Sequence, residues 1–263
     1  MNYGLYSAFL GMRARQRTLD TVANNIANAE TSGFKTDRLF HHSIEAAEAR
    51  MVGGKPVIQA PLQNGSSPLP AASDGIQRAF GLVSGGTTDF STGAFKETGR
   101  ALDVALPEEG FLVVQTPRGE RYTRAGALTI DAAGQLVTQR GELIVGQGGP
   151  ITLRPGPVSV GEDGSIASGG QVAGQLKIVK FSDPKTALTK EGDSLFSSTG
   201  TEKPQEVAAP KVASGVLEMS NVNVVSEMAV MMQNSREFDS LQRSVSMMMG
   251  DIGRKISSEI GKI

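Results

Sequence analysis

Apolar residues at the two ends of the chain follow a seven-residue repeat, whereas those in the middle alternate with polar residues over short runs. From about residue 2 to 29 the repeat predicts an amphipathic helix whose apolar stripe packs against a partner helix. A second position of the repeat holds smaller apolar residues and is interrupted by Arg15. The first position is occupied by Leu5, Met12, Leu19 and Ile26, and the second by Ala8, Val22 and Ala29.

The sequence also marks where this helix ends. Three asparagines compete with the helix for backbone hydrogen bonds, and Gly33 suits the left-handed conformation just beyond a helix end. Phe34 is then expected to hold the exiting chain against an apolar surface. The asparagines are Asn24, Asn25 and Asn28.

The last part of the chain returns to a helical pattern. Asn221 or Asn223 can cap its start, and Glu227 in the first turn faces the positive end of the helix dipole. One partner helix covers only a narrow stripe, so the remaining apolar surface predicts association between copies of the chain. One series contains Val224, Met231, Phe238, Val245 and Ile252; a flanking series contains Met228, Met249, Ile256 and Ile263, with Leu241 and Met248 alongside.

Between the helical ends, from about residue 89 to 196, short apolar runs alternate with turn residues. Closely spaced short strands of this kind predict antiparallel hairpins in a small sandwich or barrel-like unit. The predicted strands are residues 102–106, 111–114, 128–130, 136–138, 143–145 and 176–179. The predicted turns between them are residues 117–119, 131–134 and 162–165.

Residues 52–88 are rich in Gly, Pro, Ser and Asn, which predicts an extended strap, and some helical character precedes them around residues 44–50. The sequence therefore predicts an α+β protein, in which N- and C-terminal helices pair as a coiled-coil-like unit and the central domain is antiparallel and all-β. The expected segments are an N-terminal assembly helix (1–36), the strap (37–88), the β domain (89–212) and a C-terminal assembly helix (213–263).

Composition excludes several classes of function. The chain has 263 residues, no cysteine, no tryptophan, two histidines, and 26 Lys+Arg against 27 Asp+Glu. Without cysteine there is no disulfide framework, thiolate zinc site or Cys nucleophile, and the balanced charge argues against nucleic-acid or membrane-surface partners. No run approaches the ~18 apolar residues of a membrane span, and the N-terminus does not resemble a cleaved secretory signal.

Candidate chemical sites are weak. His41 and His42 are adjacent and lack further ligands, so we interpret them as exposed. Residues 146–150 lack the spacing of a phosphate loop and are expected to form a strand-ending turn. No nucleophile and base can be matched by spacing, and Glu108-Glu109 is expected to belong to an exposed turn. We therefore expect no catalytic residue, cofactor, metal or small-molecule substrate; Asp131, Asp163 and Asp183 are predicted turn residues.

The strongest oddity of composition is the group of methionines in the last helix. Flexible thioethers pack irregular gaps, and they also suit interfaces that accept slightly different neighbours. Ordinary core packing and an adaptable assembly surface both remain open. The methionines are Met228, Met231, Met232, Met247, Met248 and Met249.

Residues 19–35 resemble the N-terminal motif of bacterial flagellar rod and hook proteins, and residues 217–228 are similar to the segment that enters their C-terminal helix. Between these motifs the chain resembles the β domain of the rod subfamily at residues 98–104, 110–114, 122–126 and 134–137. The motif residues are Ala23, Asn24, Asn25, Asn28, Gly33, Phe34, Ser220, Asn221 and Val222.

This resemblance implies a subunit of the flagellar basal-body rod that polymerises into a tubular axial structure in the periplasm. It also implies export through the flagellar type III apparatus without a cleaved signal peptide, and partners that are other copies and other rod proteins. Residues 148–151, 163–166, 174–179 and 236–238 resemble the proximal-rod branch more than the distal-rod branch.

A rod carries torque through many distributed apolar contacts, and we expect the ends of an isolated subunit to be mobile and to order on assembly. The alternatives are a distal-rod subunit, a secreted β-domain binding module oligomerised by its helices, and, with weak support, a hydrolase. The predicted assembly-interface residues are Leu5, Met12, Leu19, Val22, Ile26, Val224, Met228, Met231, Phe238, Val245, Met249, Ile252 and Ile256.

Overall fold

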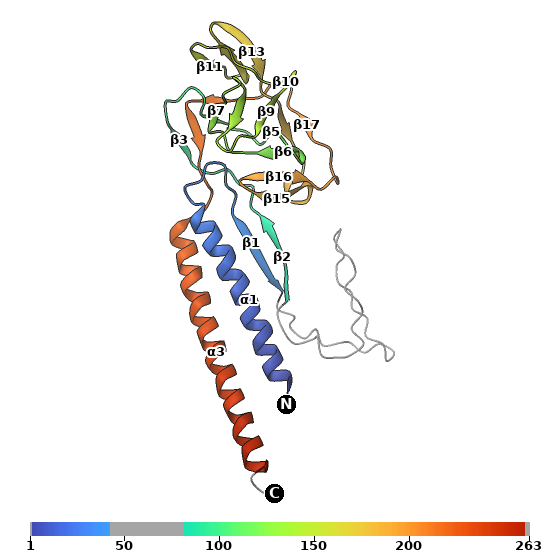
Figure 1. Cartoon of the computed structure of the whole chain (residues 1–263), viewed down its shortest axis with the longest axis vertical. Coiled ribbons are helices and arrows are strands. Elements are labelled where there is room, and N and C mark those ends of the chain that lie inside the picture. Colours follow the sequence, from blue (N-terminus) through green and yellow to red (C-terminus); the bar gives the residue numbers. More distant parts are fainter. Residues whose placement is uncertain (1, 43–81, 261–263) are drawn as a thin grey trace. The chain divides into compact units, whose positions relative to one another are not determined.

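The computed structural model describes residues 2–42 and 82–260 (Figure 1). The chain folds into two compact units. The first contains the described residues of Met1–Ala23, Leu39–Gly86 and Met228–Ile263. The second contains Asn24–Arg38 and Thr87–Glu227. Most of the predicted strap, including the helical character expected at residues 44–50, lies outside the described residues.

The first unit is built on two long helices, α1 (Asn2–Ala27) and α3 (Val224–Ile260), which run side by side (Figure 1). A Cβ atom added at Gly11 would lie 3.4 Å from Leu241 Cδ1, and Arg15 contacts Asn234. Contacts at higher residue numbers in α1 fall at lower residue numbers in α3, so the two helices are antiparallel. The predicted pairing of the terminal helices is confirmed; its coiled-coil character stays a prediction.

Two strands flank the undescribed part of the strap. They are β1 (Asp37–His42) and β2 (Leu82–Thr88), and they pair as a two-stranded sheet.

Among the described helices, none is long and apolar enough to cross a membrane.

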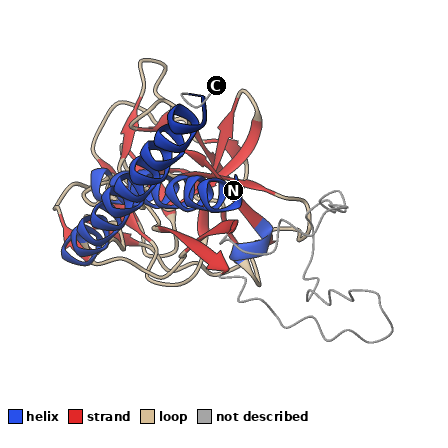
Figure 2. Ribbon diagram, turned by 90° about the horizontal axis from the view of Figure 1, so that it is seen from below, coloured by secondary structure: helices blue, strands red, loops and turns tan. Residues whose placement is uncertain are grey.

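The second unit is dominated by strands (Figure 2), and the pairings of its main sheet are antiparallel. Its main sheet runs in the order β15-β16-β6-β5-β9-β8-β7, with β10 paired to β9, and β14 paired to both β5 and β17. The predicted antiparallel β domain is therefore confirmed. The strands are β5 (Phe111–Thr116), β6 (Gly119–Thr123), β7 (Leu128–Ile130), β8 (Leu136–Thr138), β9 (Leu143–Gly146), β10 (Gly149–Pro150), β14 (Ile178–Lys180), β15 (Leu188–Gly192), β16 (Leu195–Ser198) and β17 (Gln205–Glu206).

Three smaller sheets and one short helix complete this unit. Asp183 caps α2 (Pro184–Ala187) by accepting a hydrogen bond from Lys185 N. The smaller sheets pair β11 (Val158–Val160) with β12 (Ser165–Ser168) and β12 with β13 (Gln171–Gln175); β18 (Ala213–Ser214) with β4 (Val104–Ala105); and β19 (Val216–Glu218) with β3 (Phe95–Glu97).

Residues 213–214 and 216–218 therefore form strands β18 and β19, and the helix α3 begins only at Val224. Asn223 starts α3, because its side chain accepts a hydrogen bond from Ser226 N, which confirms one of the two predicted caps. Asn221, the other candidate, bonds elsewhere.

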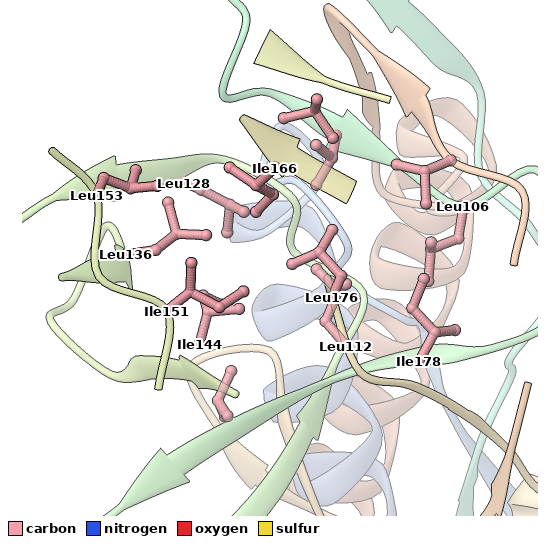
Figure 3. Close-up of a cluster of buried hydrophobic side chains, with 14 of the residues drawn as sticks. Leu106, Leu112, Leu128, Leu136, Ile144, Ile151, Leu153, Ile166, Leu176 and Ile178 are labelled. Atoms are coloured by element: carbon pink, nitrogen blue, oxygen red, sulfur yellow. The ribbon is translucent and has the colours of Figure 1, made fainter. Parts of the chain in front are cut away.

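Strand β5 is buried on both faces, which explains its continuous apolar run. Leu112 and Val114 join one apolar cluster, whereas Phe111 and Val113 join another. Side chains from many strands meet in the first cluster, among them Leu128, Leu136 and Ile144 (Figure 3). The second is rich in aromatic rings, including Tyr122, Phe181 and Phe196. Together the two clusters make a core that fixes β5 and its neighbours.

Candidate functional site

The contact between α1 and α3 uses the second seam of the N-terminal repeat. Ala8 and Val22 are buried, and Arg15 shares their side of the helix. Arg15 Nη1 donates to Asn234 Oδ1 at 3.1 Å, and its Nη2 lies 2.7 Å from Glu237 Oε2. The residue that interrupts the apolar pattern therefore meets polar partners on the other helix. Hydrogen bonds of this kind favour one alignment of two helices over its neighbours.

The predicted interface residues are not equally covered. Val22 is buried, and the half-buried residues are Met12, Leu19, Ile26, Val224, Met231, Phe238 and Val245. Met228 and Met249 are exposed. The side chains of Leu5, Ile252 and Ile256 lie outside the described residues.

Helix α3 carries apolar side chains that α1 does not cover. We call them the exposed methionines; their exposed fractions range from 40% to 65%. They are Met228, Met232, Met247, Met248 and Met249. Solvent contact with so many apolar side chains on one helix is typical of a surface that binds another protein.

A second feature, in the β-rich unit, is a buried charge cluster formed by Lys35, Arg124 and Glu218. Lys35 follows α1 and the left-handed Gly33, Arg124 follows β6, and Glu218 is the last residue of β19. Lys35 Nζ lies 2.6 Å from Glu218 Oε1, and Arg124 Nη1 lies 3.2 Å from Glu218 Oε2. The exposed side-chain fractions are 0%, 4% and 0%, respectively. Residues far apart in the sequence are thus joined away from water.

Both cations also donate to backbone carbonyl groups. Lys35 Nζ also donates to Ser91 O at 2.7 Å, and Arg124 Nη1 to Leu106 O at 2.8 Å. Burial lowers the pKa of Lys35, and the attraction of Glu218 only partly opposes this shift. Repulsion from Arg124 also lowers this pKa, but less than burial does.

Two motif asparagines hold the chain next to Lys35. Asn221 Oδ1 accepts hydrogen bonds from Thr36 N and Thr36 Oγ1 at 2.8 and 2.7 Å. Asn25 binds both backbone groups of Asp37, through Oδ1 to N and Nδ2 to O. One asparagine comes from the N-terminal motif and the other from the C-terminal motif, so the two motifs meet on residues 36–37.

Gly33 and Phe34 complete this junction. Gly33 has φ +67°, as predicted for a residue beyond a helix end, and its N–H donates to Glu218 O at 2.8 Å. Phe34 is buried, and Lys190 Nζ lies 3.6 Å from the centre of its ring. A cation therefore covers the Phe34 ring. The sequence predicted only an apolar contact for this residue.

Two of the three predicted turn aspartates, Asp131 and Asp163, lie in turns, whereas Asp183 caps the start of α2. Asp131 Oδ1 accepts from the N–H of Ala133 and Gln135, and Asp163 Oδ1 accepts from Ser165. Residues 147–148 form the turn that ends β9 and leads into β10, in agreement with the strand-ending turn predicted for residues 146–150. The side chains of residues 41–42 lie outside the described part of the chain, in which no group of three or more potential metal ligands occurs.

Three family models match the chain. They are "Flagella basal body rod protein" over residues 5–35, "Flagellar hook protein FlgE/F/G D1 domain" over residues 105–173 and "Flagellar basal body rod FlgEFG protein C-terminal" over residues 213–249. The flagellar basal-body rod protein FlgF of Caulobacter vibrioides is 34% identical over 266 residues, covering 100% of both chains. The chain belongs to the flagellar basal-body rod protein family. This confirms the resemblance seen in the sequence.

Other rod-family relatives match over similar lengths. FlgG of Bacillus subtilis is 32% identical over 263 residues, covering 92% of this chain and 93% of that protein. FlgF of Escherichia coli is 32% identical over 270 residues, covering 97% of each. These are structural proteins of the basal body, so this rod-family chain is a structural protein and not an enzyme, as predicted.

The buried charge cluster joins all three matched regions of the rod family. Lys35 ends the N-terminal match, Arg124 lies in the central match, and Glu218 lies in the C-terminal match. Sequence reasoning missed this cluster. Lys35 and Arg124 fall inside the resembling segments without any sign of a shared partner, and Glu218 stands beside the motif residues Ser220 and Asn221.

Proposed function

We propose that this protein polymerises with other subunits of the flagellar rod through its terminal helices, and that the resulting rod transmits torque. The observation that supports this proposal is the incomplete covering of α3, whose exposed methionines remain in solvent beside the α1 contact. Burying one such side chain is worth roughly 1.5 to 3 kcal/mol, so the group provides a strong drive for association.

Methionine suits this role because its side chain is unbranched and polarisable. A subunit in a rod meets other copies of itself and also different rod proteins, which present different surfaces. Flexible thioethers adapt to such neighbours better than β-branched side chains do. Many modest contacts, spread along a helix, also resist torque better than one strong contact.

We further propose the partners and location that this role requires. The partners are other copies of the chain, other rod proteins and, before assembly, the flagellar export apparatus. The assembled protein occupies the periplasmic part of the basal body and reaches it without a cleaved signal peptide. Neither nucleic acid nor a small-molecule substrate takes part.

Within the rod we favour the proximal position. The FlgF protein of Caulobacter vibrioides matches this chain from end to end, although a FlgG protein is nearly as similar. Complementation separates the two positions: the gene is introduced into otherwise identical strains that lack either their FlgF or their FlgG. Restored swimming only in the strain lacking FlgF supports the proximal position, and restoration only in the other strain contradicts it.

The assembly role is tested with substitutions on the exposed face of α3. The double variant Met228→Ser/Met232→Ser is expected to fold, because neither side chain is buried, but to restore little swimming in a strain that lacks the native gene. Basal bodies isolated from that strain should contain less of the variant than of the parent protein.

A matched control carries the same kind of change away from the helices. Val172 in β13 is 74% exposed, so Val172→Ser also removes an exposed apolar side chain. It should restore swimming fully. Full swimming with the double methionine variant, at equal protein levels, would contradict assembly through α3.

A further inference from the structure

Glu218 contacts three parts of the chain through its three oxygen atoms. Oε1 accepts from Lys35 Nζ and from Gly93 N, at 2.6 and 3.0 Å. Oε2 accepts from Arg124 Nη1 at 3.2 Å, and the backbone O accepts from Gly33 N at 2.8 Å. One residue of β19 thus holds the segment after α1, the segment before β3 and the segment after β6.

Glu218 carries the negative charge of this cluster of three residues. Lys35 and Arg124 are both cations, both are buried, and Glu218 is the only carboxylate bonded to either of them among the described residues. A buried cation that loses its counterion is strongly destabilised. Lys35 and Arg124 repel each other even with Glu218 present. Removal of β19 would leave these two cations without the carboxylate that both of them bind.

The two cations differ in how easily they can leave. Arg124 follows a strand in the middle of the main sheet, between β5 and β16, and its guanidinium lies 5.6 Å from the centre of the Phe111 ring. Lys35 lies in residues 33–36, for which no strand pairing is found. These residues are held by side chains, by the backbone O of Glu218 and by one hydrogen bond from Asp89 N to Thr36 O. The segment that leaves is therefore residues 33–36.

We infer that Glu218 makes the docking of residues 33–36 conditional on the docking of β19. With β19 in place, Lys35 is paired with its counterion, Gly33 N has its acceptor, and the segment that follows α1 is fixed. With β19 displaced, Lys35 faces Arg124 alone and residues 33–36 leave the β domain. The coupling is reciprocal, as thermodynamic linkage requires, so release of Lys35 also weakens the docking of β19. This inference concerns the single subunit and does not rest on assembly into a rod.

Hydrogen exchange on the full-length purified protein tests the inference. Glu218→Gln keeps the size of the side chain and removes its charge. The amides of Gly33 and Thr36, which donate to Glu218 O and Asn221 Oδ1, should then exchange at least about 100-fold faster, as expected when a buried counterion is lost. Glu97→Gln makes the same change at an exposed position of β3, in the same small sheet, and should leave both rates unchanged.

A double-mutant cycle separates charge compensation from packing. In a Lys35→Met background one of the two cations is already absent, so Glu218→Gln should accelerate exchange of the Gly33 amide by less than about 10-fold. If Glu218→Gln does not fold alone, the Lys35→Met/Glu218→Gln double variant should recover folding. Equal effects of Glu218→Gln in both backgrounds, or failure of the double variant to fold, would overturn the inference.

Discussion

Replacing Gly33 by alanine tests how tightly the N-terminal motif is held against the β domain. Gly33 has φ +67°, and an added Cβ would lie 2.3 Å from both Arg124 C and Ala125 N. These are backbone atoms of a chain segment that leaves the main sheet, so they cannot rotate away as the end of a side chain could. Gly33→Ala must therefore shift the segment that carries Lys35.

Two physical terms contribute to the expected loss of stability. The left-handed conformation costs an alanine about 1 to 2 kcal/mol. The steric overlap adds about 1 to 3 kcal/mol, and weakening of the Gly33 N–H bond to Glu218 O adds about 1 kcal/mol. Gly99 is a matched control, because it has φ +71° but nothing within 4 Å of an added Cβ. Gly99→Ala should lose only the first, conformational term.

The assay is chemical denaturation of the two variants and the parent protein, followed by circular dichroism at equal protein concentration. Gly33→Ala should lower the free energy of unfolding by about 2 to 4 kcal/mol more than Gly99→Ala does. Equal losses in the two variants would refute the reasoning, because they would mean that the close approach to Arg124 and Ala125 does not constrain the motif.

Three further predictions concern the β-rich unit. Ile144 is fully buried in the first apolar cluster, so Ile144→Ala should lower the free energy of unfolding by about 2 to 5 kcal/mol in the same assay, and unchanged stability would contradict the described core. Ser194 has φ +57° and a buried hydroxyl with no hydrogen-bond partner among the described residues, so Ser194→Gly should raise the free energy of unfolding by about 1 kcal/mol; a loss would argue against this turn. Burial raises the pKa of Asp103, but hydrogen bonds from Arg100 and Thr98 outweigh burial and hold the pKa below its ordinary value of 3.8. The stabilisation by this carboxylate should be complete above that value and lost as the pH falls through the lower pKa of the folded state, so the stability difference between parent and Asp103→Asn should shrink below about pH 3.8 in acid titrations; a difference that stays constant would contradict the assignment.

Local patterns in the sequence predicted those parts of the fold that depend on neighbouring residues. The seven-residue repeats located α1 and α3, and alternating apolar residues located strands such as β7 and β8 within the predicted ranges. Asp131 and Asp163 bond to nearby backbone groups, so their turns were visible in the sequence. Each of these features is determined over a few residues.

Other features had no local pattern to reveal them. The loop between β15 and β16 places Asp193 and Ser194 at positive φ, where glycine or asparagine is the usual choice, so this hairpin was missed. Lys35 and Glu218 lie 183 positions apart, and nothing near either residue indicates the other. Arg15 interrupted an apolar seam, and only the partner helix shows that the interruption is a contact.

The most direct test of the central claim is whether α3 touches a neighbouring subunit in the basal body. The chain has no cysteine, so Met232→Cys places a single attachment site for a photoactivatable cross-linker on the exposed face of α3. After illumination of intact basal bodies, the account predicts that most of the labelled protein is joined to another rod subunit. Recovery of the labelled protein only as uncross-linked single chains, from basal bodies that contain it, would contradict the account.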